Sequence, residues 1–138
     1  MDLNFPGSTP YAYTGDPAGK LTVQVEIEGF RTTAVVDTAA PYMICDPEIA
    51  EQLDFSARAS IGSQTLSTRF GHVTGNLYRA TITLLATSGR SIELEATVFV
   101  PQPDQWAENP SFLGFHGCLE RIRLAIDPGA SLFYFGPY

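Results

Sequence analysis

The sequence has few cysteines, few positive charges and no long hydrophobic run. With 2 cysteines in 138 residues, disulfide bonds cannot be the main scaffold of the fold. The 8 Lys and Arg against 15 Asp and Glu give a net charge of −7. This charge argues against nucleic acid and anionic membranes as partners, because cationic groups supply most of the affinity for both. No apolar stretch approaches the roughly 18 residues of a membrane-spanning helix.

Several catalytic and binding motifs are also absent. His72 and His116 lack the spacing of metal ligands, so no metal and no cofactor are expected. There is no GxSxG segment for a serine hydrolase and no glycine-rich loop with the lysine that binds phosphate. Cys45 and Cys118 lie outside CxxC spacing, which favours a reduced, cytoplasmic setting, although a disulfide between them stays open. The amino terminus shows no secretory signal, which agrees with that setting.

What the sequence does have is enough apolar material for one domain. Hydrophobic residues make up 44% of it, and a chain of this length can bury roughly two-thirds of its unfolded surface. Residues 1–20 hold three prolines and three glycines, which interrupt regular structure, so they are predicted to form an N-terminal arm. Residues 21–138 are predicted to form the single folded domain.

Alternating apolar and polar residues predict an all-β fold. The two-residue period of a half-buried strand is clearest in 21–27, 78–86 and 92–100, and shorter strands are predicted at 31–36, 42–45, 123–127 and 132–135. Residues 60–70 are polar and indicate an exposed strand or loop that leads into a hairpin. Asp46, Pro47 and Glu48 form a helix start, and 116–122 permits one or two more helical turns. Seven or eight strands and two short helices predict a closed barrel without βαβ units.

One segment carries a chemical signal. In VVDTAAPYMIC, Asp37 ends a hydrophobic strand and is followed by Thr38, Ala39 and Ala40, small residues that permit a tight turn and leave the carboxylate open to a cleft. This segment resembles the active-site motif of retropepsin-like aspartic peptidases. The resemblance extends to the preceding LTVQVEIEGFRTTAVVD, the following DPEIAEQL and the later FLGFHGCLERIRLAID.

The resemblance implies a closed acid-protease barrel and an aspartic endopeptidase that acts on peptides or proteins. In such enzymes two aspartates about 3 Å apart share one proton and activate a water molecule. The chain has one such motif, since Asp127 precedes Pro-Gly and is typical of a turn. The second carboxylate is therefore expected from Asp37 of another copy in a homodimer. The hydroxyl of Thr38 would then link the two active-site loops.

The resemblance also assigns supporting residues. Ala40 matches the family motif, whereas Ala39 replaces the usual glycine and adds a methyl group beside the carboxylates. Leu113 and Gly114 match the family's second motif, although Phe115 and His116 replace the pair that often follows it in viral members. A substrate-covering hairpin, or flap, is implied near residues 68–75, with Phe70, Gly71, His72 and Val73 as its candidate residues.

Three alternatives stay open at this point. Asp37 could serve only as an Asx-turn residue at a strand end. The chain could be a catalytically weak or inactive module of the same fold, in which Ala39 has removed activity and the dimer binds peptide or only dimerises. It could also be a small β-barrel that binds an apolar ligand. The position of Trp106 between prolines favours neither a structural role nor a partner contact.

Overall fold

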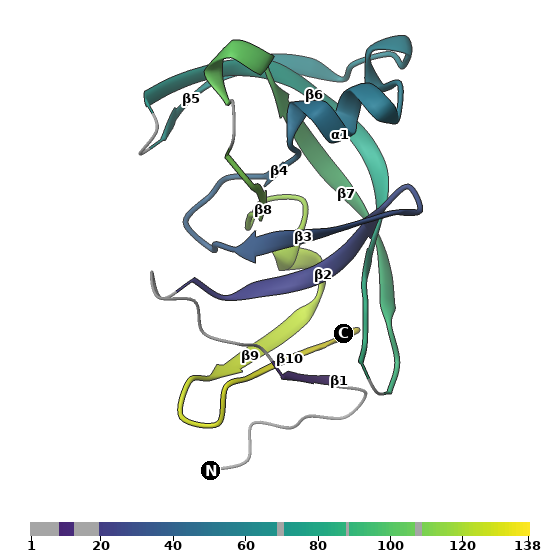
Figure 1. Cartoon of the computed structure of the whole chain (residues 1–138), viewed down its shortest axis with the longest axis vertical. Coiled ribbons are helices and arrows are strands. Elements are labelled where there is room, and N and C mark those ends of the chain that lie inside the picture. The colour runs from purple at the N-terminus through teal and green to yellow at the C-terminus, as the bar shows by residue number, and fades with distance from the viewer. Residues whose placement is uncertain (1–8, 13–19, 69–70, 88, 107–108) are drawn as a thin grey trace.

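A computed structural model describes residues 9–12, 20–68, 71–87, 89–106 and 109–138. These residues form ten strands, one α-helix and three 3₁₀ helices (Figure 1). In chain order the elements are β1 (Thr9–Ala12), β2 (Thr22–Ile27), β3 (Phe30–Val36), β4 (Met43–Ile44), α1 (Pro47–Gln52), η1 (Phe55–Ala57), β5 (Gly62–Thr68), β6 (Gly71–Leu84), β7 (Ile92–Pro101), η2 (Pro103–Gln105), β8 (Ser111–Leu113), η3 (Leu119–Arg121), β9 (Arg123–Asp127) and β10 (Leu132–Gly136).

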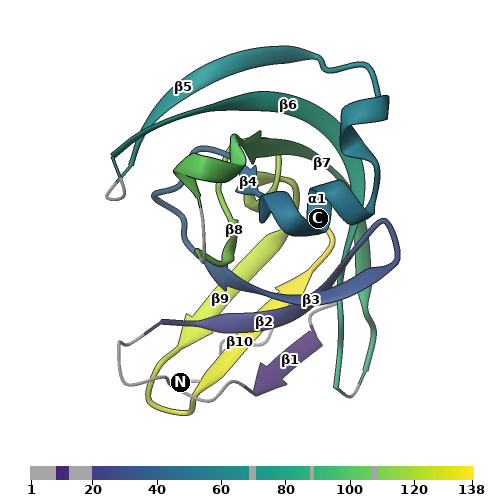
Figure 2. The same ribbon diagram turned by 45° about the horizontal axis from the view of Figure 1, so that its top comes forward.

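Six strands close into a barrel. Their order is β2-β3-β8-β4-β7-β6, and pairing of β6 with β2 completes the ring. Strand β5 pairs with β6 outside this ring, and both strands curve along the top of the molecule (Figure 1, Figure 2). Strands β1, β10 and β9 form a separate antiparallel sheet at the opposite end. The prediction of a closed all-β barrel is confirmed.

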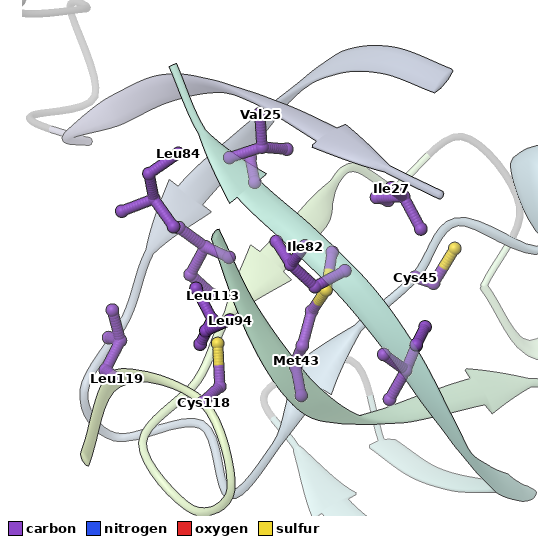
Figure 3. Close-up of a cluster of buried hydrophobic side chains, with 14 of the residues drawn as sticks. Val25, Ile27, Met43, Cys45, Ile82, Leu84, Leu94, Leu113, Cys118 and Leu119 are labelled. Atoms are coloured by element: carbon purple, nitrogen blue, oxygen red, sulfur yellow. The ribbon is translucent and has the colours of Figure 1, made fainter. Parts of the chain in front are cut away.

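Two apolar clusters lie on opposite faces of the central strands. Neighbouring residues of one strand point to opposite faces, and here both faces are buried. The first cluster, shown in Figure 3, includes one member from each of four strands: Ala34, Met43, Val98 and Leu113. The residues next to these four, Val35, Ile44, Phe99 and Phe112, belong to the second cluster, together with Leu66, Val73, Leu77 and Trp106. The second cluster therefore joins the barrel to the β5–β6 hairpin.

The predicted helix start is confirmed at α1. Oδ1 of Asp46 accepts a hydrogen bond of 2.9 Å from the backbone N–H of Glu48, and Pro47 is the first helical residue. The backbone N–H of Asp46 also donates to the hydroxyl of Ser111, at 2.9 Å, which connects the helix start to β8. Of the helices in the described ranges, none is long and apolar enough to cross a membrane.

Some elements differ from the predictions. The described residues form more strands than the seven or eight expected, partly because Thr9–Ala12 pairs with β10 inside the predicted arm. The helical turns predicted in 116–122 reduce to the single 3₁₀ turn η3, because Gly117 takes a positive φ of 67° that interrupts a helix. Gly75, the last residue of the segment 68–75 in which the flap was predicted, lies inside β6 opposite Pro101.

Candidate active site

Asp37 follows directly after β3, and backbone hydrogen bonds hold its loop on both sides. The N–H of Asp37 donates to the carbonyl of Leu113 at 3.0 Å, next to the parallel pair of Val36 and Leu113. The N–H of Ala39 donates to Oδ1 of Asp37 at 3.0 Å, and that of Ala40 to the Asp37 carbonyl at 3.1 Å. The Asx turn considered from the sequence is therefore present, and it orients a half-buried carboxylate.

The segment after β8 crosses this loop at close range. The N–H of Phe115 donates to the carbonyl of Ala40, and that of His116 to the carbonyl of Pro41, both at 2.8 Å. A Cβ atom at Gly114 would lie 2.7 Å from the carbonyl oxygen of Ala40 and closer still to that of Tyr42. Only glycine permits this approach, so the structure gives a physical reason for the residue at the second predicted motif.

A pocket of about 340 Å³ opens beside the carboxylate. Its lining residues are Asp37, Ala39, Ala40, Pro41, Ile44, Ser67, Thr68, Trp106 and Phe112. Within the described lining, only Asp37 has an ionisable side chain. Apolar groups of the second cluster form much of the wall. The pocket thus combines one carboxylate with hydroxyl groups and an apolar surface suited to a side chain of an extended ligand.

Trp106 has a structural place that the sequence left open. Its side chain is buried, and its indole N–H donates to the carbonyl of Pro110 at 3.0 Å. Its ring packs edge-on against Phe112, with 5.8 Å between the ring centroids. Trp106 also lines the pocket beside Asp37, although the two residues are far apart in the sequence. Periodicity could not have found this contact, because the tryptophan lies in a loop between prolines.

The hairpin of β5 and β6 takes the place where the flap was predicted. Gly71 has a φ of +99° at the start of β6, and His72 is exposed. Phe70 lies outside the described residues. Val73, predicted to contact substrate, is instead fully buried in the second cluster, because the alternation along β6 turns it inward. Thr68, at the start of the predicted flap segment, lines the pocket, and so does Ser67, which was missed because nothing distinguishes it in a polar segment.

Thr38 lies on another side of the loop from the Asp37 pocket. Its side chain is exposed at the rim of a shallow groove of about 640 Å³, whose other walls include Phe115, Leu119, Leu124 and Tyr138. Phe115 is 48% exposed there, which is high for a large apolar side chain. The groove leaves Thr38 accessible to another molecule.

Two further predicted features can be placed. Ala39 is not among the residues with positive φ, so alanine causes no backbone strain here, and its methyl group simply lines the pocket. Asp127 is a turn residue as expected, since its Oδ1 accepts a hydrogen bond of 3.2 Å from the N–H of Ala130. The described part of the chain contains no group of three His, Cys, Asp or Glu residues that could hold a metal ion.

Both cysteines are free and buried. Burial raises the pKa of the Cys45 thiol to about 12, and the nearby charge of Asp46 acts in the same direction. Burial also raises the pKa of the Cys118 thiol to about 12, against a smaller opposite effect of Arg121. Neither thiol is therefore a candidate nucleophile, since the thiolate is the reactive form.

A closed barrel with an aspartate loop after β3, crossed by a Leu-Gly segment, defines a retropepsin-like fold. A retropepsin-like aspartic protease from Rickettsia conorii has a similar structure, with a TM-score of 0.63 at 16% sequence identity, over 95% of this chain and 91% of that chain. The protease of simian foamy virus (mac) matches with a TM-score of 0.41 at 24% identity, over 67% of this chain and 86% of that chain. No family model and no curated protein sequence matches the chain. The predicted fold is confirmed.

Proposed function

We propose that this chain is an aspartic endopeptidase that works as a homodimer. The observation that carries the proposal is the position of Asp37. Its carboxylate is oriented by the N–H of Ala39 and opens into an apolar-walled pocket, in a fold that resembles that of an aspartic protease. This arrangement favours a hydrolytic site over a simple Asx turn, which would need no pocket.

The proposed chemistry uses two copies of Asp37. One carboxylate, ionised, removes a proton from a water molecule, and the oxygen of that water attacks the carbonyl carbon of the peptide bond. The other carboxyl group, protonated, donates a hydrogen bond to the carbonyl oxygen as negative charge develops on it. Two close carboxylates hold one proton between them because both cannot ionise at once. The proton then passes to the leaving amine as the C–N bond breaks.

The need for a second chain follows from the pocket itself. Its described lining offers a single carboxylate, so a dyad requires Asp37 from another copy on a twofold axis. The exposed Thr38 and the half-exposed Phe115 lie beside the same loop and are available for contact with that copy. Two chains, each at −7, carry −14 together, so dimerisation should strengthen as the pH falls toward the isoelectric point of about 4.6.

The pocket also suggests a substrate class. Ile44, Trp106 and Phe112 supply apolar walls, and the hydroxyls of Ser67 and Thr68 supply hydrogen-bonding groups. We infer a preference for extended peptides with an apolar side chain next to the scissile bond. Burial of such a side chain is worth roughly 1.5–3 kcal/mol.

Replacement of the carboxylate tests the proposal. Cleavage of a peptide library at pH 4–7, followed by mass spectrometry, should fall at least about a thousandfold in Asp37→Asn, because the amide cannot act as the base. Asp104→Asn is the matched control, since Asp104 is exposed in η2 and lies outside the pocket lining. Equal cleavage by wild type and Asp37→Asn would exclude the mechanism.

The oligomeric state is tested separately by sedimentation at several concentrations. Dimers should form at tens of micromolar and become tighter between pH 7 and pH 5. A chain that stays monomeric while cleaving peptides would rule out the shared dyad.

The Ala39 methyl supports a second candidate, a weak or inactive module that binds peptide through the same pocket. Ala39 lines the pocket with Asp37, where its methyl group occupies space that glycine leaves free. Under this alternative, wild type shows peptide binding without cleavage, and Ala39→Gly gains cleavage activity. Under the peptidase proposal, wild type is active and Ala39→Gly changes the rate by less than about tenfold. Turnover measured beside peptide binding by fluorescence anisotropy separates the two.

A further inference from the structure

The hairpin of β5 and β6 leaves the barrel at one backbone position, Thr74. The ladder between β6 and β7 ends at the pair of Gly75 and Pro101, and proline has no N–H with which to continue it. Gly75 lies so close to β7 that an added Cβ atom would be 2.8 Å from the carbonyl carbon of Val100. From Thr74 to Gly71, the described residues of β6 have a strand partner only on the β5 side.

Beyond the end of this ladder, residues of the loop after β7 form hydrogen bonds with the backbone of Thr74. The N–H of Gln102 donates to the carbonyl of Thr74 at 3.0 Å. The side-chain Oε1 of Gln105 accepts a hydrogen bond of 2.7 Å from the N–H of Thr74. The amide of Gln105 thus stands where the carbonyl of a neighbouring strand would otherwise lie, and both backbone groups of Thr74 are satisfied.

The same loop forms part of the Asp37 pocket. Gln105 directly precedes Trp106, whose buried ring lines that pocket. On β5, Thr65 is paired with Thr74, and Ser67 and Thr68 follow it into the pocket lining. The hydrogen bond of Gln105 therefore connects two parts of the pocket wall, the tryptophan loop and the hairpin.

We propose that Gln105 is a positioning residue for substrate binding, which fixes the hairpin at Thr74 so that Ser67 and Thr68 stay beside Asp37. This inference rests on the proposed peptidase function. Gln105 does not line the Asp37 pocket, so its effect passes through the backbone of Thr74. Without the bond the hairpin spends less time in the binding arrangement, and the apparent substrate affinity falls in proportion.

Amide hydrogen exchange tests the structural part without any substrate. Gln105→Met keeps the length of the side chain but removes the acceptor, and Gln105→Glu keeps an acceptor oxygen. Exchange of peptides covering 62–68 and 71–76 should become on the order of tenfold faster in Gln105→Met, as expected for the loss of one hydrogen bond. It should stay near the wild-type rate in Gln105→Glu. Gln64→Met is the matched control, because Gln64 lies exposed on β5.

Peptide cleavage tests the functional part. In Gln105→Met, KM should rise roughly three- to tenfold with kcat within about twofold, since the carboxylates are untouched. Gln105→Glu should restore KM. Unchanged peptide exchange over 62–76 in Gln105→Met, equal acceleration in Gln105→Glu, or a fall in kcat without a rise in KM would each overturn the proposal.

Peptide cleavage and hydrogen exchange distinguish a failure of the peptidase proposal from a failure of the Gln105 proposal. If the wild-type protein cleaves no peptide, the peptidase proposal fails, whereas the exchange rates still decide whether Gln105 holds the hairpin. Exchange of the amides in β2 reports whether each variant is folded, since β2 lies in the barrel away from the loop. Faster exchange in β2 as well as in the hairpin would count against a local role for Gln105.

Discussion

The two sides of the Asp37 pocket are held in different ways. The Asp37 loop is crossed by the segment of Gly114 at backbone contact, with hydrogen bonds from Asp37, Phe115 and His116 that span residues far apart in the sequence. The β5–β6 hairpin is held by its own ladder, by buried side chains such as Val73, and by the bonds at Thr74.

The difference suggests that the two walls of the pocket differ in rigidity. The Asp37 loop is held by backbone atoms packed closely against Gly114, which would suit the proposed dyad, in which two carboxylates lie at a defined distance. The hairpin depends on side chains of the second cluster, which can repack, and this suits a wall that receives ligands of different shape.

The largest effect is expected at the Asp37 loop. Gly114→Ala should destabilise the protein by about 3 kcal/mol or more, because its Cβ atom would overlap the backbone carbonyls of Tyr42 and Ala40. Urea unfolding measures this loss. Gly129→Ala is the control, since its Cβ atom would meet only Asp127 Oδ1 at 3.5 Å, and it should stay within about 0.5 kcal/mol of wild type. A loss below about 1 kcal/mol in Gly114→Ala would mean that the backbone of the Asp37 loop can move enough to accommodate the methyl group.

A smaller effect is expected at the hairpin. Val73→Ala should cost about 2 kcal/mol, because it removes two buried methyl groups, at about 0.8 kcal/mol each, from the second cluster and leaves a cavity there. His72→Ala, one residue away and exposed, should change the free energy of unfolding by less than about 0.5 kcal/mol. Equal effects of the two substitutions would show that the hairpin does not pack on the barrel in solution.

A pH-dependent effect is expected at the two buried thiols, Cys45 and Cys118, which belong to the first apolar cluster. Both have a pKa raised from 9.0 to about 12 in the folded protein. The unfolded chain loses these protons first as pH rises, so the stability they contribute is complete below pH 9 and is lost between pH 9 and 12. Each thiol should lower the free energy of unfolding by at most about 1.4 kcal/mol per pH unit in that window.

Denaturation at pH 8, 9 and 10 checks this slope, with Cys45→Ala and Cys118→Ala as controls that remove one thiol each. Each variant should lose stability less steeply than wild type above pH 9. A slope that is the same with and without the cysteines would show that water reaches these thiols in the folded protein and that the first cluster is less tightly closed around them than the structure indicates.

Much of the barrel could be predicted from the sequence because strand residues report their own environment. The alternation in 21–27, 78–86 and 92–100 matches β2, β6 and β7, and Asp46 caps α1 as expected. The apolar run predicted at 42–45 contains β4. Strand β1 carries little pattern of its own and is a strand because β10 pairs with it.

The candidate site was only partly predictable. The loop from Asp37 to Ala40 and the pair Leu113 and Gly114 do come together, since a motif is local and its order along the chain is visible. Val73 was expected to face the substrate from the flap, but its side chain is buried. The register of β6 decides which residues face inward, and a shift of one residue reverses every side chain. Ser67, Trp106 and Gln105 carry no local signal at all.

The sequence by itself determined most of the barrel strands, the helix start and the single carboxylate in its tight turn, since each depends on residues close together in the chain. Only the tertiary structure decided which strands close the barrel, that a second apolar cluster supports the hairpin, and that Trp106 shares a pocket with Asp37. These features depend on contacts between residues distant in sequence. Such contacts form only when the barrel closes, and alternation along one strand gives its faces but not its neighbours.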